Sequence, residues 1–292
     1  LTFTTSETVR TPTVTISGQS ATVSGSNASW TAVRTLTNSD PEGAVAFTID
    51  YMDLVGNQGV RGTETTDFTG ITYDRTVPAL PSVVIESDNF YDVSLAKVED
   101  EISINFTTSE IIQTPTVIIG GDSATISGSN TSWLAVREMT STDDEGSLLF
   151  TIDFLDPAGN AGSQVISTTD GSGITFDRTA PTMSSVVISS NNSNYTTLAK
   201  VADSVNIAIV ASESIQEPVV SIGGMAALIT GSATSWGAIR AMISGDPDGS
   251  IGFTIDYMDM AGNDGTQSTQ TSDNSDVELS GEFELLDDNK SL

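Results

Sequence analysis

The sequence contains no cysteine and no histidine among its 292 residues. These absences exclude disulfides, thiolate nucleophiles, Ser-His-Asp triads and zinc sites built from Cys and His. Any metal site in this chain must therefore use oxygen ligands. A secreted protein without disulfides obtains its rigidity from packing or from a bound metal, and both routes are open to this one.

Positive charge is also scarce. Ten Lys and Arg residues stand against 39 Asp and Glu residues, which gives a formal net charge of −29. Nucleic-acid binding depends on clustered cations that replace counterions at the phosphates, and this chain has few cations to cluster. We therefore expect it to bind no nucleic acid, to be repelled by anionic membranes and to attract cations.

Long hydrophobic runs are missing as well. No window approaches the roughly 18 continuous apolar residues of a membrane span, so we expect no direct membrane insertion by this segment. No signal-peptide pattern is visible. Leu1 stands inside an apparent strand, and we therefore expect the chain to be a fragment whose start carries no information about export.

What the sequence does contain is a repeat of 103 residues. Trp30, Trp133 and Trp236 are separated by this step, with no insertion or deletion between them. Other landmarks follow the same step: Pro12, Pro115 and Pro218, the Ser-Glu pairs at Ser6, Ser109 and Ser212, and Arg34, Arg137 and Arg240. We predict repeats at 1–76, 77–179 and 180–279, followed at 280–292 by an acidic tail or the start of a further segment. The first repeat aligns only from "LTFTTSE" onward and lacks an opening strand.

Period-2 alternation of apolar residues dominates each repeat and predicts strands. In "ISINF" (102–106) and "FTIDF" (150–154) the apolar residues fall on one face. The sequences near residues 18, 121 and 224 predict tight hairpins that need positive φ. The complete second repeat yields seven strands, near 82–87, 101–108, 114–119, 123–127, 133–140, 147–154 and 163–177. We therefore predict an all-β protein of three tandem seven-stranded immunoglobulin-like β-sandwiches arranged as a rod.

Several motifs are similar to those of bacterial immunoglobulin-like repeats in giant surface adhesins and other repetitive prokaryotic cell-surface proteins. They are "ITFDRTAP" at the repeat junction, "TLAKVADSVNI" (197–207), "ASESI" (211–215), "PVVSIGG" (218–224) and "FTIDYMDMAGN" (253–263). The resemblance covers the chain up to about residue 279. It implies a position outside the cell, on the surface of a prokaryote. It also implies calcium at domain junctions, as is thought for related adhesin repeats.

The strand order independently gathers acidic residues at each junction. In a seven-stranded sandwich the loops after the second and sixth strands lie at the pole where the domain begins, and the linker from the preceding repeat enters there. Asp and Asn in such loops also bond their own backbone, so a purely structural polar hairpin is the alternative. The predicted calcium ligands are Asp74, Glu110, Asp153 or Asp156, and Asn160 at the first junction, and Asp177, Glu213, Asp256 or Asp259, and Asn263 at the second.

The series of predicted sites ends at both ends of the chain. The loop of the first repeat, with Asp53 and Asn57, has no preceding linker, and position 280 is Ser where a linker Asp would stand. We therefore expect calcium at two junctions only.

Other repeated residues suggest simpler roles. The Asp153 and Asp156 pair could suggest a glycosidase, but an enzyme seldom repeats its active site in every repeat, and we predict no enzymatic activity. The repeated Trp is expected in or near the core, although a sugar-stacking platform is the alternative. The repeated Arg is expected to pair with a cross-strand acid. Lys97 and Lys200 resemble isopeptide lysines but fit ordinary strand entry.

The sequence favours a non-enzymatic extracellular stalk, rigidified by calcium at the junctions, whose partners are the other domains of the same surface polypeptide. A first alternative is a subunit of a self-assembling surface layer or filament that contacts identical subunits. In that case the tail, with Val277, Leu279, Phe283 and Leu285, could donate a strand to the first repeat of the next subunit. A second alternative is a carbohydrate-binding adhesive module.

Overall fold

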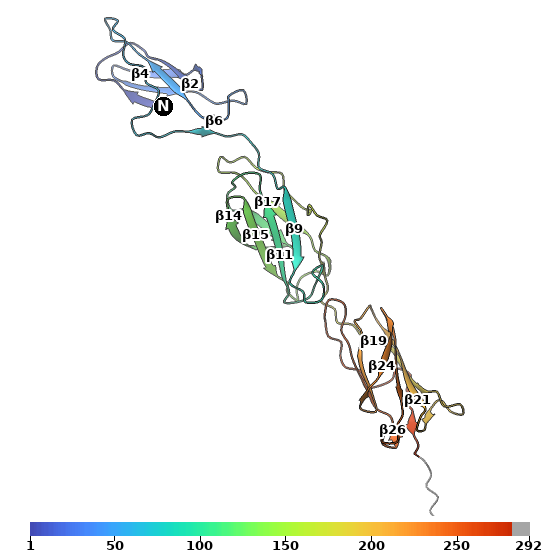
Figure 1. Cartoon of the computed structure of the whole chain (residues 1–292). Coiled ribbons are helices and arrows are strands. Elements are labelled where there is room, and N and C mark those ends of the chain that lie inside the picture. The colour runs from blue at the N-terminus through green and yellow to red at the C-terminus, as the bar shows by residue number, and fades with distance from the viewer. Residues whose placement is uncertain (282–292) are drawn as a thin grey trace, which may run out of the picture.

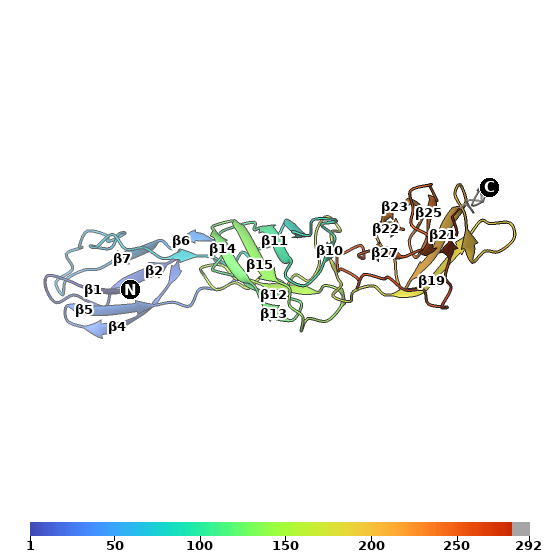
Figure 2. The ribbon, with the colours of Figure 1, turned by 90° about the horizontal axis from the view of Figure 1, so that it is seen from below.

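The computed structural model describes residues 1–281, and this part of the chain consists of strands, turns and loops. Residues 282–292, which hold most of the predicted tail with Phe283 and Leu285, lie outside the described residues. Three domains follow one another along an elongated molecule (Figure 1), and the view turned by 90° shows the same extended arrangement (Figure 2). Among the described residues, no helix has the length and apolar character required to cross a membrane.

The three domains use the same order of strands. Domain 1 contains β1 (Thr2–Thr4), β2 (Thr13–Ile16), β3 (Gln19–Ser20), β4 (Thr22–Ser26), β5 (Ser29–Val33), β6 (Gly43–Ala44), β7 (Phe47–Asp50) and β8 (Thr72–Tyr73). Domain 2 contains β9 (Ser82–Ser87), β10 (Leu95–Ala96), β11 (Glu101–Thr107), β12 (Thr116–Ile119), β13 (Asp122–Ser123), β14 (Thr125–Ser129), β15 (Ser132–Glu138), β16 (Gly146–Ser147), β17 (Phe150–Asp153) and β18 (Thr175–Phe176). Domain 3 contains β19 (Met183–Ser190), β20 (Leu198–Ala199), β21 (Ser204–Ala211), β22 (Val219–Ile222), β23 (Met225–Ala226), β24 (Leu228–Ser232), β25 (Ser235–Ala241), β26 (Gly249–Ser250), β27 (Phe253–Asp256) and β28 (Glu278–Leu279).

Domains 2 and 3 are immunoglobulin-like sandwiches. One layer of domain 2 is a four-stranded antiparallel sheet in the order β14-β15-β11-β9. The facing layer contains β13-β12-β17 and β10-β18-β16, in which β10 and β18 run parallel. Domain 3 repeats this arrangement with β24-β25-β21-β19, β23-β22-β27 and β20-β28-β26. The topology confirms the predicted fold class.

The core follows the predicted alternation. In β11, Ile102 and Ile104 are fully buried and Phe106 is 2% exposed. Phe106 lies between Val83 of β9 and Trp133 of β15 in register, so one hydrophobic ladder crosses three strands. Trp133 is 7% exposed within the core of domain 2, and Trp236 packs partly buried against the core of domain 3, which confirms the expected position in or near the core.

The hairpin turns also match the sequence. Ser17 and Gly18, with φ of 52° and 73°, join β2 to β3. Gly223 and Gly224, with φ of 60° and 76°, occupy the same turn in domain 3. Positive φ at both central residues gives the twist that paired strands need.

The predicted strand at 163–177 is wrong over most of its length. Only Thr175–Phe176 forms a strand, and Val165 makes an isolated bridge to Ile152. In the intervening segment Thr168 Oγ1 donates to the carbonyl of Ser172 at 2.7 Å, and contact with β9 runs partly through side chains, as where Thr169 Oγ1 accepts the N–H of Val83 at 3.0 Å. Side-chain hydrogen bonds of this kind compete with the sheet ladder.

The repeated arginine pairs in each domain with an acid in the turn after its own strand, and Arg137 also pairs at 2.8 Å with Asp122, an acid on another strand, β13. Arg240 pairs with Asp246 at 2.6 Å and Arg34 pairs with Asp40 at 2.6 Å, and each Asp stands in the turn after the strand rather than across the sheet. The side chains of Arg240 and Asp246 are each 8% exposed, and the side chain of Asp246 also accepts the backbone N–H of Ile243 at 2.8 Å. A six-residue separation fits a turn that folds back over its own strand.

Lys97 and Lys200 each form an ion pair with the Asp three residues later, at 3.2 Å to Asp100 and 2.7 Å to Asp203. Asp100 also accepts a hydrogen bond from Asn89 Nδ2 at 2.6 Å. The two lysines thus form ordinary ion pairs just before β11 and β21 begin, which fits the prediction of a strand entry.

Domain 1 differs at one edge. Its sheet is β4-β5-β1, and within the described residues no strand covers the second edge of β1. In the part of the chain that the structure describes, β8 likewise pairs only with β6. The buried cluster between the sheets of this domain contains only Val14, Ala32 and Ile49 among the described residues, with Phe3 and Phe47 partly buried around it.

Candidate metal centres at the domain junctions

The linker between two domains is first tied to the domain that it leaves. Asp177 N donates to the carbonyl of Ala96 at 2.8 Å. The Glu145 carboxylate then accepts the backbone N–H of Arg178 at 3.0 Å and Thr179 Oγ1 at 2.6 Å. The Arg178 guanidinium donates to the Ser141 carbonyl. Glu42 holds Arg75 and Thr76 in the same way at the first junction.

The linker is next tied to the domain that it enters. Thr182 N donates to Ser212 Oγ at 2.9 Å, and Ser212 N donates to the Thr182 carbonyl at 2.8 Å. Ser109 makes the equivalent pair of bonds with Ala79. Because Glu213 and Glu110 follow these serines directly, their position relative to the linker is set by backbone contacts.

The loop after β27 supplies the third carboxylate. Asp259 Oδ1 accepts the N–H groups of Gly262 at 2.7 Å and Asn263 at 2.9 Å, and Oδ2 accepts Asn263 Nδ2 at 2.7 Å. Asn263 Nδ2 also donates to the Asp177 carbonyl at 3.0 Å. Gly262 has φ of 91°, which allows the loop to close around the carboxylate. Asn263 therefore connects the linker to the loop through hydrogen bonds.

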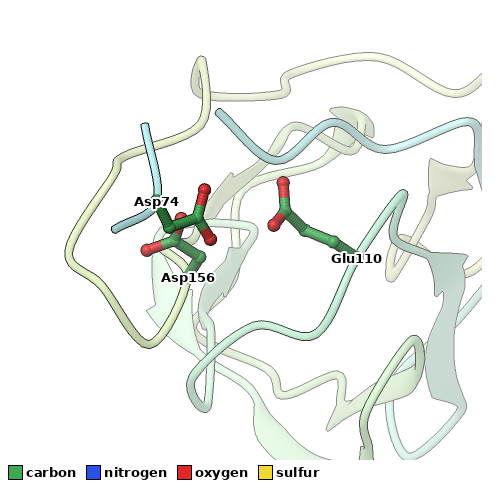
Figure 3. Close-up of side chains that lie close together, drawn as sticks. All are labelled: Asp74, Glu110 and Asp156. Atoms are coloured by element: carbon green, nitrogen blue, oxygen red, sulfur yellow. The ribbon is translucent and has the colours of Figure 1, made fainter. Parts of the chain in front are cut away.

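These anchors bring three carboxylates together at each junction. The clusters are Asp74, Glu110 and Asp156, and Asp177, Glu213 and Asp259, with one oxygen of each residue within 4.8 Å of the others. Figure 3 shows the first cluster, with the side chains of the linker Asp and the two loop residues lying close together. Asp156 is fully buried and Asp259 is 1% exposed, whereas the other four residues are half-buried.

The charges in these clusters repel one another. Burial, followed by the nearby charges of Asp74 and Asp156, raises the pKa of Glu110. Burial and the charges of Asp177 and Asp259 raise the pKa of Glu213 in the same way. Burial also opposes ionisation of Asp156, but the hydrogen bonds from Asn160 and Gly159 prevail and lower its pKa.

No positive side chain offsets this repulsion among the described residues, because no ion pair there includes a member of either cluster. Glu110 Oε1 is buried and has no hydrogen-bond donor. An ionised buried oxygen without a partner is costly unless a cation approaches it. Three carboxylates that converge from two domains fit a divalent ion, so each cluster could bind a metal.

Two predicted ligands lie elsewhere. Asp153 and Asp256 are exposed at the ends of β17 and β27. Their carboxylates accept hydrogen bonds from Gln164 Nε2 at 3.0 Å and Gln267 Nε2 at 2.7 Å. Side chains alternate along a strand, and this places both residues on the outer face. Of the two alternatives at each junction, the structure brings Asp156 and Asp259 into the clusters.

Sequence reasoning did not single out several residues that position the clusters. Glu42 and Glu145 hold the linkers, and Gln113 and Gln216 donate to the carbonyls of Asp156 at 2.9 Å and Asp259 at 3.1 Å. Both pairs follow the step of 103 residues, so a comparison of the repeats could have identified them.

The loop itself folds without a cluster. In domain 1, Asp53 Oδ1 accepts the N–H groups of Gly56 at 2.6 Å and Asn57 at 2.8 Å, although the linker Asp is absent there. At the far end of domain 3, Ser280 occupies the linker position and donates its N–H to Ala199. The polar-hairpin interpretation therefore accounts for the loop conformation, but it leaves the convergence of Asp74 and Glu110 on this loop unexplained.

A second contact joins domains 2 and 3. Asn89 Nδ2 donates to the carbonyl of Ala261 at 2.8 Å, and both residues are buried. The Tyr91 ring lies against Gly262, where an added Cβ would come within 2.6 Å of Tyr91 Cε2. The loop after β9 thus packs on the loop that carries Asp259.

The raised pKa values predict a pH dependence when metal is removed. Folded Glu110, Glu213 and Asp177 bind more protons than the unfolded chain near their raised pKa values. In a chelator, stability should therefore increase as the pH falls from neutral toward the ordinary carboxyl range. Thermal unfolding between about pH 7.5 and pH 5 measures this effect. A Glu110→Gln/Glu213→Gln variant should show a weaker increase, and identical slopes for the two proteins would contradict the assignment.

No protein-family model matches the sequence, and no curated protein is similar enough to match it. Among solved structures, the chain is similar to the I9–I11 tandem of titin, with 11% identity, coverage of 96% of this chain and 91% of that one, and a TM-score of 0.32. It is similar to the fibronectin(III)-like modules of Clostridium thermocellum CbhA, with 10% identity, coverage of 67% and 93%, and a TM-score of 0.32. A Corynebacterium diphtheriae protein described as membrane anchored gives 10% identity, coverage of 97% and 86%, and a TM-score of 0.24. The fold assignment rests on the strand topology of the chain itself.

Proposed function

We propose that this chain is part of a non-enzymatic stalk on the surface of a prokaryotic cell, and that calcium at its junctions keeps the domains in line. The observation that carries the proposal is the convergence, within 4.8 Å, of a linker carboxylate from one domain and two loop carboxylates from the next. An ion held by both sides would resist bending of the junction.

The donor set favours calcium over magnesium. Calcium takes six to eight oxygen ligands at about 2.3–2.6 Å and accepts irregular geometry, whereas magnesium requires a strict octahedron and keeps its waters. Asp74, Glu110 and Asp156 would hold the ion at the first junction, and Asp177, Glu213 and Asp259 at the second. The side-chain amides of Asn160 and Asn263 donate hydrogen bonds to the backbone carbonyls of the linker, so we assign these residues a positioning role.

The junctions are suited to bearing load. The linkers are short, Pro78 and Pro181 are buried at their ends, and each linker is hydrogen-bonded to both neighbouring domains. A stalk of this kind would have the remaining domains of the same surface polypeptide as its partners. The net charge of −29 favours a soluble surface that does not bind other polyanions.

The proposal predicts two calcium ions per chain and a change of shape on their removal. Isothermal titration should give two sites. Calcium should also raise the melting temperature, because it binds the folded state. At a calcium concentration 100 times the dissociation constant, one site adds about 2.7 kcal/mol to the free energy of unfolding. Small-angle scattering should give a longer, narrower particle in calcium than in a chelator. The Glu110→Gln/Glu213→Gln variant, which keeps the shape of both side chains, should lose most of this response.

Equal melting temperatures and equal scattering profiles in a chelator and in millimolar calcium would contradict the proposal. Calcium binding without a change in scattering would retain the metal sites but refute their role in stiffening.

A further inference from the structure

Domain 2 reaches domain 3 with a second segment besides the linker. This segment is the loop between β9 and β10, residues 88–94, and it lies against the loop of domain 3 that carries Asp259. Asn89 Nδ2 donates to the Ala261 carbonyl at 2.8 Å, and the two residues are 5% and 2% exposed. Neither Asn89 nor Tyr91 belongs to the carboxylate cluster. The contact between the two loops therefore does not require a cation.

The Asn89 side chain is fixed inside domain 2 before it meets domain 3. Its Oδ1 accepts the N–H groups of Tyr91 at 3.0 Å and Asp92 at 3.2 Å. Its Nδ2 also donates to Asp100 Oδ2 at 2.6 Å, so the side-chain amide bonds to both domains. Asp100 is held in turn by the backbone N–H of Lys97 at 2.8 Å. A donor that is oriented in advance loses little side-chain entropy when the two domains meet.

An apolar contact covers the same loop of domain 3 beside this hydrogen bond. The Tyr91 ring lies so close to Gly262 that an added Cβ would stand 2.6 Å from Cε2 and 2.9 Å from Cδ2. The same Cβ would be 3.8 Å from Lys97 Cε. The Lys97 side chain is 32% exposed, whereas that of its counterpart Lys200 in domain 3 is 66% exposed. Burial of the ring and of the lysine stem favours the aligned junction.

The contacted residues belong to the loop that shapes the third carboxylate. The Gly262 N–H donates to Asp259 Oδ1 at 2.7 Å, and Ala261 directly precedes this glycine. Without a cation, the like charges of Asp177, Glu213 and Asp259 repel one another across the junction. The hydrogen bond and the ring contact act against this repulsion, because both hold the loop on domain 2.

We propose that Asn89 and Tyr91 position the second metal centre by holding the 259–263 loop against domain 2 before an ion binds. The metal part of this inference rests on the proposed function, whereas the contact between the domains does not. An ion would add its ligands to a junction that is already oriented, so less conformational freedom would be lost on binding. Loss of the contact should leave both domains folded, widen the range of angles between them and weaken the second site.

Domain 3 offers a matched control for the amide. Asn192 is the counterpart of Asn89; it donates to Asp203 Oδ2 at 2.8 Å and accepts the N–H of Asn194 at 3.0 Å. Within residues 1–281, its side chain makes no hydrogen bond to another domain. Asn192→Ala therefore removes the same bonds inside a loop as Asn89→Ala does, but no bond between domains. Tyr91→Asn introduces the side chain that domain 3 carries at the counterpart position 194, so the loop should keep its fold.

Spin-label distances across the junction, measured in a chelator, test the contact directly. The chain has no cysteine, so Thr125→Cys and Ser232→Cys, at exposed positions of β14 and β24, each accept one label. The labelled parent and its Asn192→Ala variant should give the same distance distribution. Asn89→Ala should lower the ratio of aligned to bent molecules by about 3- to 10-fold, and Tyr91→Asn should lower it as well. Identical distributions for Asn89→Ala and Asn192→Ala would overturn the proposal.

Calcium titration distinguishes a failure of this proposal from a failure of the proposed function. Asn89→Ala should weaken one of the two sites by about 3- to 10-fold and leave the other unchanged. Asn192→Ala should leave both sites unchanged. Equal calcium affinities in the two variants would overturn the positioning role. If the parent protein bound no calcium, the proposed function would fail together with the metal part of this inference, and the distances in chelator would decide the contact between the domains.

Discussion

Replacement of Asp143 by Ala is expected to destabilise domain 2 by about 2–4 kcal/mol, because it removes the buried one of the two carboxylates that pair with Arg137 and leaves the guanidinium with Asp122 alone, whose side chain is 71% exposed. Arg137 is 9% exposed and Asp143 is 5% exposed. Asp143 Oδ2 also accepts the N–H of Thr140 at 2.7 Å and so closes the turn after β15. Both the charge balance and the turn would be lost together.

Calorimetry of the full chain, combined with hydrogen exchange to assign the affected domain, measures this effect. The matched control is Asp50→Ala, which removes the partner of Arg61 in an ion pair whose side chains are 61% and 44% exposed. Exposed pairs contribute about 0–1 kcal/mol, so this variant should remain close to the parent. Equal destabilisation of the two variants would show that Arg137 does not depend on the buried pairing.

Replacement of Asp156 by Ala is expected to lower calcium affinity at the first junction by at least about 100-fold, because it removes the one fully buried carboxylate of the cluster. It also removes the hydrogen bonds to Gly159 and Asn160 that close the loop. A loss of binding could thus come from the loop alone.

Asp53→Ala separates these two causes. Asp53 makes the same hydrogen bonds to Gly56 and Asn57, but no linker carboxylate faces it. Asp53→Ala should therefore loosen its loop, visible by hydrogen exchange, and leave the calcium stoichiometry at two. Asp156→Ala should loosen its loop and reduce the stoichiometry to one. If both variants retained two calcium ions, the acidic clusters would be structural turns only.

Much of the fold could be predicted because its signals are local. Apolar alternation in "ISINF" and "FTIDF" predicts which side chains are buried, since a strand has only two faces. Gly18 and the pair Gly223 and Gly224 predict hairpins because glycine accepts positive φ without a steric penalty. The repeat of 103 residues then extends each local prediction to three places.

The errors arose where a choice depended on contacts between distant segments. Each repeated Arg was expected to pair with an acid on a neighbouring strand, but the turn after its own strand folds back to meet it, as Asp246 meets Arg240, although Arg137 also reaches Asp122 on β13. The segment 163–177 has the composition of a strand, but Thr168, Asp170 and Ser172 bond locally and interrupt the ladder. Local patterns do not reveal which of two available hydrogen-bond partners is closer.

The sequence by itself determined the three domains, their sandwich architecture and the residues that could meet at each junction, because spacing and alternation are properties of the chain alone. Only the tertiary structure decided that Asp156 and Asp259 face the linker carboxylates while Asp153 and Asp256 face solvent. It also decided that Asn89 and Tyr91 of domain 2 pack on the loop of domain 3 that carries Asp259. Both outcomes depend on segments far apart in the chain that meet only when the two sheets pack and the linkers dock.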